Sequence, residues 1–112
     1  MATIKSYTDL QQSKKLAEIL PLESADMSWV SNGLGKPFAR TIPIKGDPEE
    51  LCACWSLAAL LGVLPDYTLQ TNTDGTVFVV CESKKPMISD AYDNPVDACY
   101  ELILKLNELN LL

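Results

Sequence analysis

Near its beginning, the chain shows apolar residues at the spacing of an amphipathic helix, with polar residues between them. Leu10, Ala17 and Leu20 share one helical face, and Pro21 ends the run. The stretch opens with Thr8-Asp9-Leu10-Gln11, which has the form of a capping box with the Thr8 hydroxyl at the N-cap. We therefore predict a surface helix that begins after Thr8 and ends before Pro21.

The last part of the chain has the same periodicity. Asn94 is a good N-cap residue, and Pro95 follows at the first helical position, where its missing N–H costs nothing. Glu101 precedes Lys105 by four residues, the favourable order for an ion pair on a helix. The face predicted to be buried consists of Val96, Cys99, Leu102, Ile103, Leu106 and Leu109.

The longest apolar stretch runs from Leu51 to Leu64 and ends at Pro65. It follows Asp47-Pro48-Glu49-Glu50, a sequence typical of a helix start. The stretch is too short to cross a bilayer and is apolar on nearly all sides. We predict a helix over Leu51–Leu64 that is the most buried helix of the molecule, with Trp55 in the core.

Two pairs of strands are predicted between these helices. Tyr67–Gln70 and Thr76–Glu82 flank Asp74-Gly75, a strong hairpin signal, and the run from Val77 to Cys81 is typical of a strand covered on both faces. Met27–Val30 and Phe38–Ile42 form a weaker earlier pair. The predicted fold is α+β, with a small antiparallel sheet packed against three helices in the order α-β-β-α-β-β-α.

Composition places the chain among ordinary globular proteins. It has 112 residues, of which 47% are hydrophobic and 21% charged, and we expect residues 1–112 to form a single domain. It contains no histidine. That excludes Ser-His and Cys-His nucleophile pairs and zinc sites that use histidine.

The net charge is −6 and is unevenly distributed. Residues 1–46 carry six basic and four acidic side chains, whereas residues 47–112 carry three basic and eleven acidic ones. An acidic surface repels phosphates, so we expect neither nucleic acid nor a membrane as partner. Weak nucleic-acid binding through the basic N-terminal part stays an alternative; its residues are Lys14, Lys15, Lys36, Arg40 and Lys45.

No motif in the chain assembles a nucleophile, a base and an orienting group, and we expect no cofactor and no metal. Cys52 and Cys54, two residues apart, would point away from each other on a helix and could not share a metal ion. The alternative of a small enzyme rests on Cys52 or on the carboxylates of Asp90, Asp93 and Asp97.

Two aromatic residues and an arginine are the candidate partner-binding residues. Trp29 and Phe38 fall on the two strands of the earlier predicted pair, and Arg40 lies two residues beyond Phe38. If the two strands lie at a sheet edge, these side chains form an aromatic patch suited to a protein partner.

Three segments carry a resemblance to a known family: Ile4 to Met27, Cys54 to Leu61 and Asn94 to Leu112. They resemble a family of short uncharacterised proteins of gut anaerobic bacteria and of their phages and mobile elements. The resemblance implies an intracellular product associated with a phage or mobile element, and it implies no catalytic residue.

These observations favour a non-enzymatic protein-interaction module whose partner is another protein, with self-association into a homodimer left open. No apolar segment follows Lys5, which argues against a secretory signal. The four cysteines suit a reducing compartment, so we expect the protein to be cytoplasmic.

Overall fold

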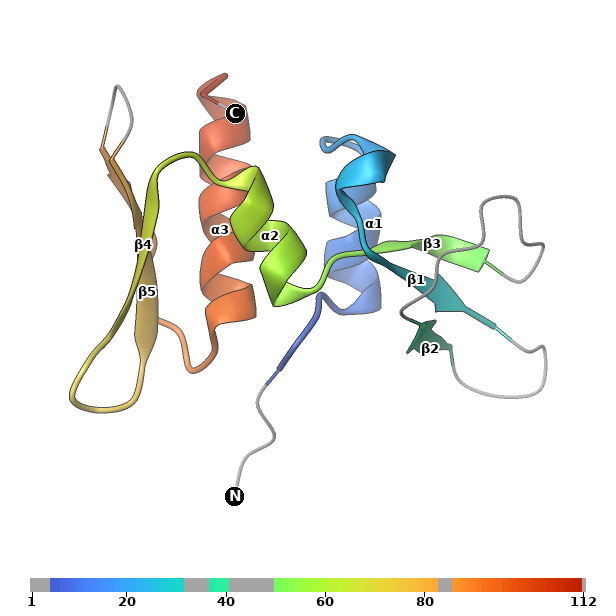
Figure 1. Ribbon diagram of the computed structural model, residues 1–112, viewed down its shortest axis with the longest axis horizontal. Coiled ribbons are helices and arrows are strands. Elements are labelled where there is room, and N and C mark those ends of the chain that lie inside the picture. Colours follow the sequence, from blue (N-terminus) through green and yellow to red (C-terminus); the bar gives the residue numbers. More distant parts are fainter. Residues whose placement is uncertain (1–4, 32–36, 41–49, 83–85, 112) are drawn as a thin grey trace.

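The computed structural model describes residues 5–31, 37–40, 50–82 and 86–111. Two three-stranded antiparallel sheets lie at opposite ends of the molecule, and three helices lie between them (Figure 1). The predicted α+β class and the three helices are confirmed. The strands, however, form two small sheets rather than one, and each predicted pair gains a third strand: the apolar stretch before Trp55 pairs in the first sheet, and Met87–Ile88 pairs in the second.

The first helix, α1 (Leu10–Ala17), begins one residue later than predicted. Asp9, not Thr8, is the N-cap, and its capping box is completed by Gln12. Thr8 is used elsewhere, since its N–H donates to the carbonyl of Trp55 at 2.9 Å and its hydroxyl lies 2.7 Å from that of Ser13. Thr8 and Ser13 are both fully buried by these contacts.

The first sheet follows a short 3-10 turn, η1 (Leu22–Ser24). It consists of β1 (Met27–Val30), β2 (Phe38–Arg40) and β3 (Glu50–Cys54), with β1 in the centre. The β1 and β2 pair was predicted, but the last two residues of the predicted second strand, at positions 41–42, lie outside the described residues.

The prediction of one helix over Leu51–Leu64 is wrong in its first half. Glu50–Cys54 forms strand β3, and α2 (Leu57–Val63) begins only after Ser56, whose hydroxyl accepts from the N–H of Ala59. The predicted helix start at 47–49 lies outside the described residues. The physical reason is pairing: β3 hydrogen-bonds along β1, and this outweighs the helical preference of an apolar run.

The second sheet consists of β4 (Tyr67–Thr71), β5 (Val77–Cys81) and β6 (Met87–Ile88), with β5 in the centre. The predicted hairpin between β4 and β5 is confirmed. Gly75 in its turn has a φ of +90°, a conformation that favours glycine.

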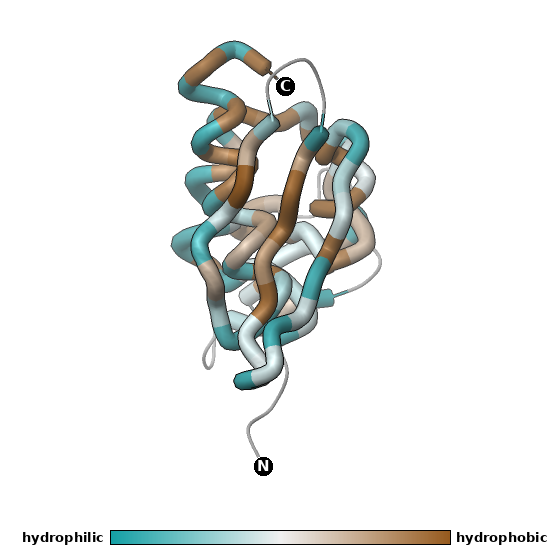
Figure 2. The backbone as a smooth tube through the Cα atoms, turned by 90° about the vertical axis from the view of Figure 1, so that its left-hand side faces the viewer, coloured by the Kyte–Doolittle hydropathy of each residue, from teal (hydrophilic) through white to brown (hydrophobic). Residues whose placement is uncertain are grey.

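Only one face of this sheet is covered. Val79 and Cys81 are fully buried on the side of α3, whereas Phe78 and Val80 on the other side are half-buried. The prediction that β5 is covered on both faces is therefore wrong. Figure 2 looks at the uncovered face, where the apolar β5 runs between the more polar β4 and the short, apolar β6.

The last helix, α3 (Pro95–Glu108), matches the prediction closely. The side chain of Asn94 accepts from the N–H of Asp97, with Pro95 at the start, and Lys105 lies 3.0 Å from Glu101. Of the residues predicted to be buried on this helix, only Leu109 is exposed, because it lies past the end of the helix.

The core joins all three helices to the second sheet. Trp55 is fully buried, as predicted, but α3 rather than the helix after Trp55 is the most buried helix, because α2 has only seven residues. No helix within the described residues is long and apolar enough to span a bilayer. The buried members of the core are Leu16, Leu20, Trp55, Leu60, Leu64, Val79, Cys81, Val96, Ala98, Cys99, Leu102, Ile103 and Leu106.

Candidate functional site

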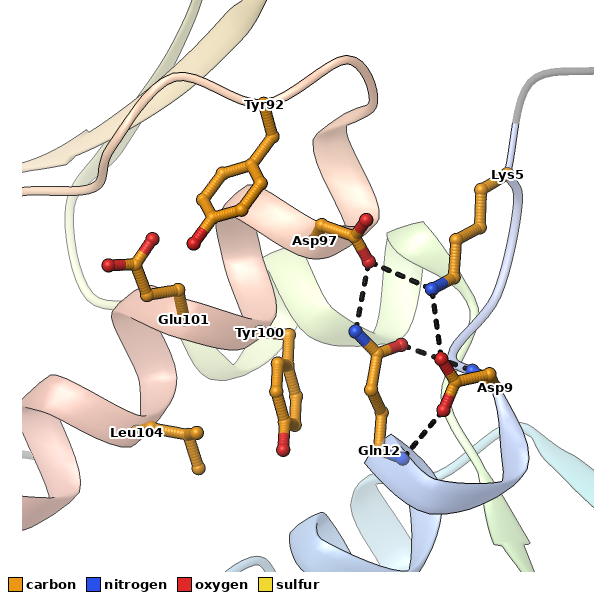
Figure 3. Close-up of a pocket in the computed structure, with 8 residues that line it drawn as sticks. All are labelled: Lys5, Asp9, Gln12, Tyr92, Asp97, Tyr100, Glu101 and Leu104. Carbon is orange, nitrogen blue, oxygen red and sulfur yellow. Dashed lines mark hydrogen bonds and ion pairs between the residues drawn. The ribbon is translucent and has the colours of Figure 1, made fainter. Parts of the chain in front are cut away.

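An open pocket of about 350 Å³ lies between α1 and α3, where the chain entering α1 passes the start of α3 (Figure 3). Most of its wall consists of charged and aromatic side chains, with one amide and one aliphatic side chain beside them. The lining residues are Lys5, Asp9, Gln12, Tyr92, Asp97, Tyr100, Glu101 and Leu104.

Asp97 holds one end of the pocket together. Its Oδ1 accepts from Lys5 Nζ at 2.8 Å and from Gln12 Nε2 at 2.9 Å, and its Oδ2 accepts from Asn94 Nδ2 at 2.8 Å. Lys5 also reaches Asp9 at 3.3 Å. The ion pair and the amide contact therefore join α3 to the N-terminal segment and to α1.

The charges of this ion pair are stabilised by each other. Partial burial acts to raise the pKa of Asp97, but the bonds from Lys5, Asn94 and Gln12 outweigh it and hold the pKa below its usual value. Burial likewise acts to lower the pKa of Lys5, and Asp97 and Asp9 outweigh it and raise that pKa. Both groups are charged at neutral pH.

The other end of the pocket holds two phenols and a carboxylate. Glu101, which can accept a hydrogen bond from the Tyr92 phenol, raises the pKa of Tyr92 to about 12. Burial and the charge of Asp9 raise the pKa of Tyr100. Burial acts to raise the pKa of Glu101, but Tyr92 and Lys105 outweigh it and lower that pKa.

The pocket is thus suited to hold a cation. Three carboxylates, those of Asp9, Asp97 and Glu101, line it, and two tyrosine rings offer π faces. Lys5 pairs with the first two carboxylates, and Lys105 lies 3.0 Å from that of Glu101. Oε2 of Glu101 is buried and has no hydrogen-bond partner among the described residues. Each resolved pKa shift among the lining groups favours the charge state that the group already has at neutral pH, so the shifts do not prepare a group for proton transfer there.

The structure brings together two of the three carboxylates in the enzyme alternative. The side-chain amide of Asn94 donates to Asp93 and to Asp97, at 2.8 Å each, while Asp90 is exposed. Within the described residues, no group of three or more acidic, cysteine or histidine residues is arranged to hold a metal ion. Asp97 itself is engaged by Lys5.

The cysteines are spread through the fold, and none of the four forms a disulfide. Cys52, predicted near a helix N-terminus, lies instead in strand β3 and is half-buried. Cys54, Cys81 and Cys99 are fully buried, and this burial raises the pKa of each thiol, to about 12 for Cys99. Such thiols are poor nucleophiles.

Trp29, Phe38 and Arg40 lie on adjacent strands, but they do not share a face. Trp29 is opposite Ala39 in the ladder, so its side chain lies on the other side of the sheet from Phe38 and Arg40. Its Nε1 donates to the Thr8 carbonyl and to the Ser13 hydroxyl, at 3.2 and 3.1 Å. Phe38 is exposed and Arg40 is half-buried.

The basic N-terminal residues do not form one described surface. Lys14 and Lys15 are exposed on α1, and Lys15 lies 3.8 Å from Glu18. The lysines at positions 36 and 45 lie outside the described residues.

Sequence reasoning missed the pocket, although part of its signal was present. Asp97, Tyr100, Glu101 and Leu104 recur at spacings of three and four, which places them on one face of α3. Nothing in the sequence around Lys5 indicated its place in the pocket, because that place depends on its contact with Asp97, 92 positions away.

Neither a scan against models of protein families nor searches of the curated proteins and of the solved structures finds a match to this chain. The resemblance of its three segments to phage and mobile-element proteins therefore stays a prediction.

Proposed function

We propose that this protein is a non-enzymatic protein-interaction module that binds a basic side chain of its partner in the pocket between α1 and α3. The observation that carries the proposal is the composition of this pocket, whose lining includes three carboxylates and two tyrosine rings but only one ammonium group, that of Lys5. A lysine or arginine side chain is the group that such a pocket fits best.

The charge of the surrounding chain supports the proposal. Residues 47–112, which include α3, carry eleven acidic and three basic side chains. A surface of one sign attracts a partner of the opposite sign and speeds its association. An arginine guanidinium can stack on an aromatic ring such as that of Tyr100, and it can donate to a carboxylate.

The two alternative functions have less support. In the enzyme alternative, Asp97 would have to act while bound to Lys5, and the half-buried Cys52 lies in a strand with no histidine in the chain to act as its base. In the nucleic-acid alternative, phosphates would meet an acidic α3, and the two described lysines of α1 offer little compensation.

The proposal extends to origin and location. An origin in a phage or mobile element is supported by the resemblance of the three segments alone. A cytoplasmic location is supported by the four cysteines, all described and none in a disulfide.

The test is a titration of the ¹⁵N-labelled protein with acetyl-Gly-Arg-Gly-amide, followed by NMR. We expect saturable shifts of the amide signals of Gln12, Tyr100 and Glu101, which weaken as salt is added. The matched ligand is the same peptide with citrulline, which keeps the shape of arginine and lacks its charge. It should bind at least about tenfold more weakly, which corresponds to about 1.4 kcal/mol.

A pair of variants completes the test. Glu101→Gln removes a pocket carboxylate and should weaken binding of the arginine peptide several-fold. Glu108→Gln removes the same charge from an exposed position on α3 outside the pocket and should leave binding unchanged. Equal binding of the arginine and citrulline peptides, or no binding of either, would overturn the proposal.

A further inference from the structure

The outer edge of the second sheet is an open strand. Within the described residues, β4 pairs with β5 on one side and with no strand on the other. In Figure 2, β4 forms the right-hand edge of the sheet. All five residues of β4, Tyr67 to Thr71, are exposed.

The hydrogen bonds at the two ends of the hairpin show which backbone groups face outward. The carbonyl of Asp66 accepts from the N–H of Glu82 at 3.0 Å, and the N–H of Asn72 donates to the carbonyl of Thr76 at 2.7 Å. In an antiparallel ladder the backbone groups of alternate residues point to the same neighbour. Even-numbered residues of β4 therefore face β5, and three odd-numbered residues, Tyr67, Leu69 and Thr71, face outward.

This edge lacks the features that usually prevent strand pairing. Proteins protect open edges with charged residues, prolines or bulges. The sequence Tyr-Thr-Leu-Gln-Thr of β4 has no charge and no proline, and its register with β5 is unbroken over all five pairs. Tyr67 and Leu69 also leave 42% and 37% of their surface exposed beside α3.

We propose that β4 pairs antiparallel with β4 of a second copy of this chain, about a twofold axis at Leu69. Leu69 then lies opposite Leu69 of the partner subunit, and Tyr67 lies opposite Thr71 of the partner subunit. Every residue with outward backbone groups meets another such residue, which allows six new hydrogen bonds across the edge. The two sheets join into one sheet of six strands.

The uncharged sequence of β4 allows a second copy to pair with it despite the net charge of the protein. A protein of net charge −6 repels its own copies over most of its surface, so self-association needs an uncharged contact. β4 supplies one, and its sequence pairs with itself without placing like charges opposite each other. The twofold axis is perpendicular to the sheet, so both α3 helices lie on the same face and the exposed Tyr67 and Leu69 gain neighbours.

The proposal does not depend on the pocket, and its first test is the mass in solution. Sedimentation equilibrium from about 1 µM to about 1 mM should show a monomer of 12.3 kDa that converts to a species of twice that mass. Leu69→Asp places two carboxylates opposite each other at the axis and should weaken the dimer at least about tenfold. Thr68→Asp adds the same charge on the other face of β4 and should weaken it far less.

A crosslink tests the register. Hydrogen-bonded antiparallel pairs have Cα atoms about 5.5 Å apart, within the range of a disulfide. Leu69→Cys should therefore form a disulfide-linked dimer under mild oxidation. Thr68→Cys, which is not opposite itself, should crosslink no more than the unaltered protein with its half-buried Cys52. A monomer at all concentrations, or a dimer equally sensitive to both aspartate variants, would overturn the proposal.

Discussion

Asp97 Oδ1 and Lys5 Nζ lie 2.8 Å apart although 92 residues separate them in the chain. Both side chains are mostly buried, with 27% and 28% of their surface exposed. The same Asp97 oxygen accepts from Gln12 on α1. One carboxylate therefore connects the N-terminal segment, α1 and α3, and forms one end of the candidate pocket.

Replacing Asp97 should destabilise the fold. Asp97→Asn keeps the size of the side chain and the backbone hydrogen bond from residue 97 to Asn94, but removes the charge that Lys5 meets. We expect the free energy of unfolding at pH 7, measured in urea, to fall by about 1–3 kcal/mol. Asp93→Asn at an exposed position is the control and should change it by less than about 0.5 kcal/mol. Equal effects of the two variants would contradict this role of Asp97.

The effect of Asp97→Asn on stability should depend on pH. The pKa of Asp97 is lowered in the folded state. Its contribution to the free energy of unfolding is therefore fully present above the pKa of the unfolded state, about 3.9, and is lost as the pH falls through the pKa of the folded state. The pKa of Lys5 is raised, so its contribution is present below about 10.4 and is lost as the pH rises through the folded pKa. The stability difference between the unaltered protein and Asp97→Asn should be constant between these limits and shrink outside them, as measured by urea unfolding across the pH range.

Substitutions of Trp29 and of Phe38 should differ in their effects on stability. Trp29→Phe removes the indole N–H that serves Thr8 and Ser13, and we expect a loss of about 1–2 kcal/mol in the free energy of unfolding. Phe38→Ala, at an exposed site on the opposite face, should cost less than about 0.5 kcal/mol. If Phe38→Ala costs as much as Trp29→Phe, the assigned faces are wrong.

Capping and turn motifs predicted the elements that depend on residues close to them in the chain. The Asn94-Pro95 start of α3 and the Asp74-Gly75 hairpin were found because capping and turn geometry depend on neighbours in the chain. The N-cap of α1 was misplaced by one residue for the opposite reason. Thr8 is recruited by Trp55, 47 residues away, and Asp9 is left to cap the helix.

The apolar stretch before α2 shows where pattern alone fails. Leu51 to Cys54 is apolar at every position, a pattern that fits a buried helix and a strand equally well. Pairing with β1 makes this stretch a strand rather than a helix, with Cys54 opposite Met27 and Cys52 opposite Trp29. The pocket was hidden similarly, since its two walls come from opposite ends of the sequence.

The thiols should differ in reactivity. Cys54, Cys81 and Cys99 are fully buried and their pKa values are raised, so each should resist iodoacetamide at pH 7.5 until the protein unfolds. The half-buried Cys52 should be the first to react. Peptide mass spectrometry after timed alkylation, with a sample in urea as control, gives the order. Rapid native labelling of Cys99 would contradict its burial.

Ser56 marks the junction between β3 and α2 and tests where that helix begins. Its hydroxyl accepts from the N–H of Ala59 at 3.2 Å and donates to Asp26, while its own N–H donates to Asp26 at 2.9 Å. Ser56→Ala removes both hydroxyl contacts, and we expect the free energy of unfolding to fall by about 1–2 kcal/mol. Thr73→Ala in the exposed hairpin turn is the control and should have little effect. A helix that began before Leu51 would place Ser56 in its interior and need no cap there, so a neutral Ser56→Ala would favour the single long helix over the strand and short helix described above.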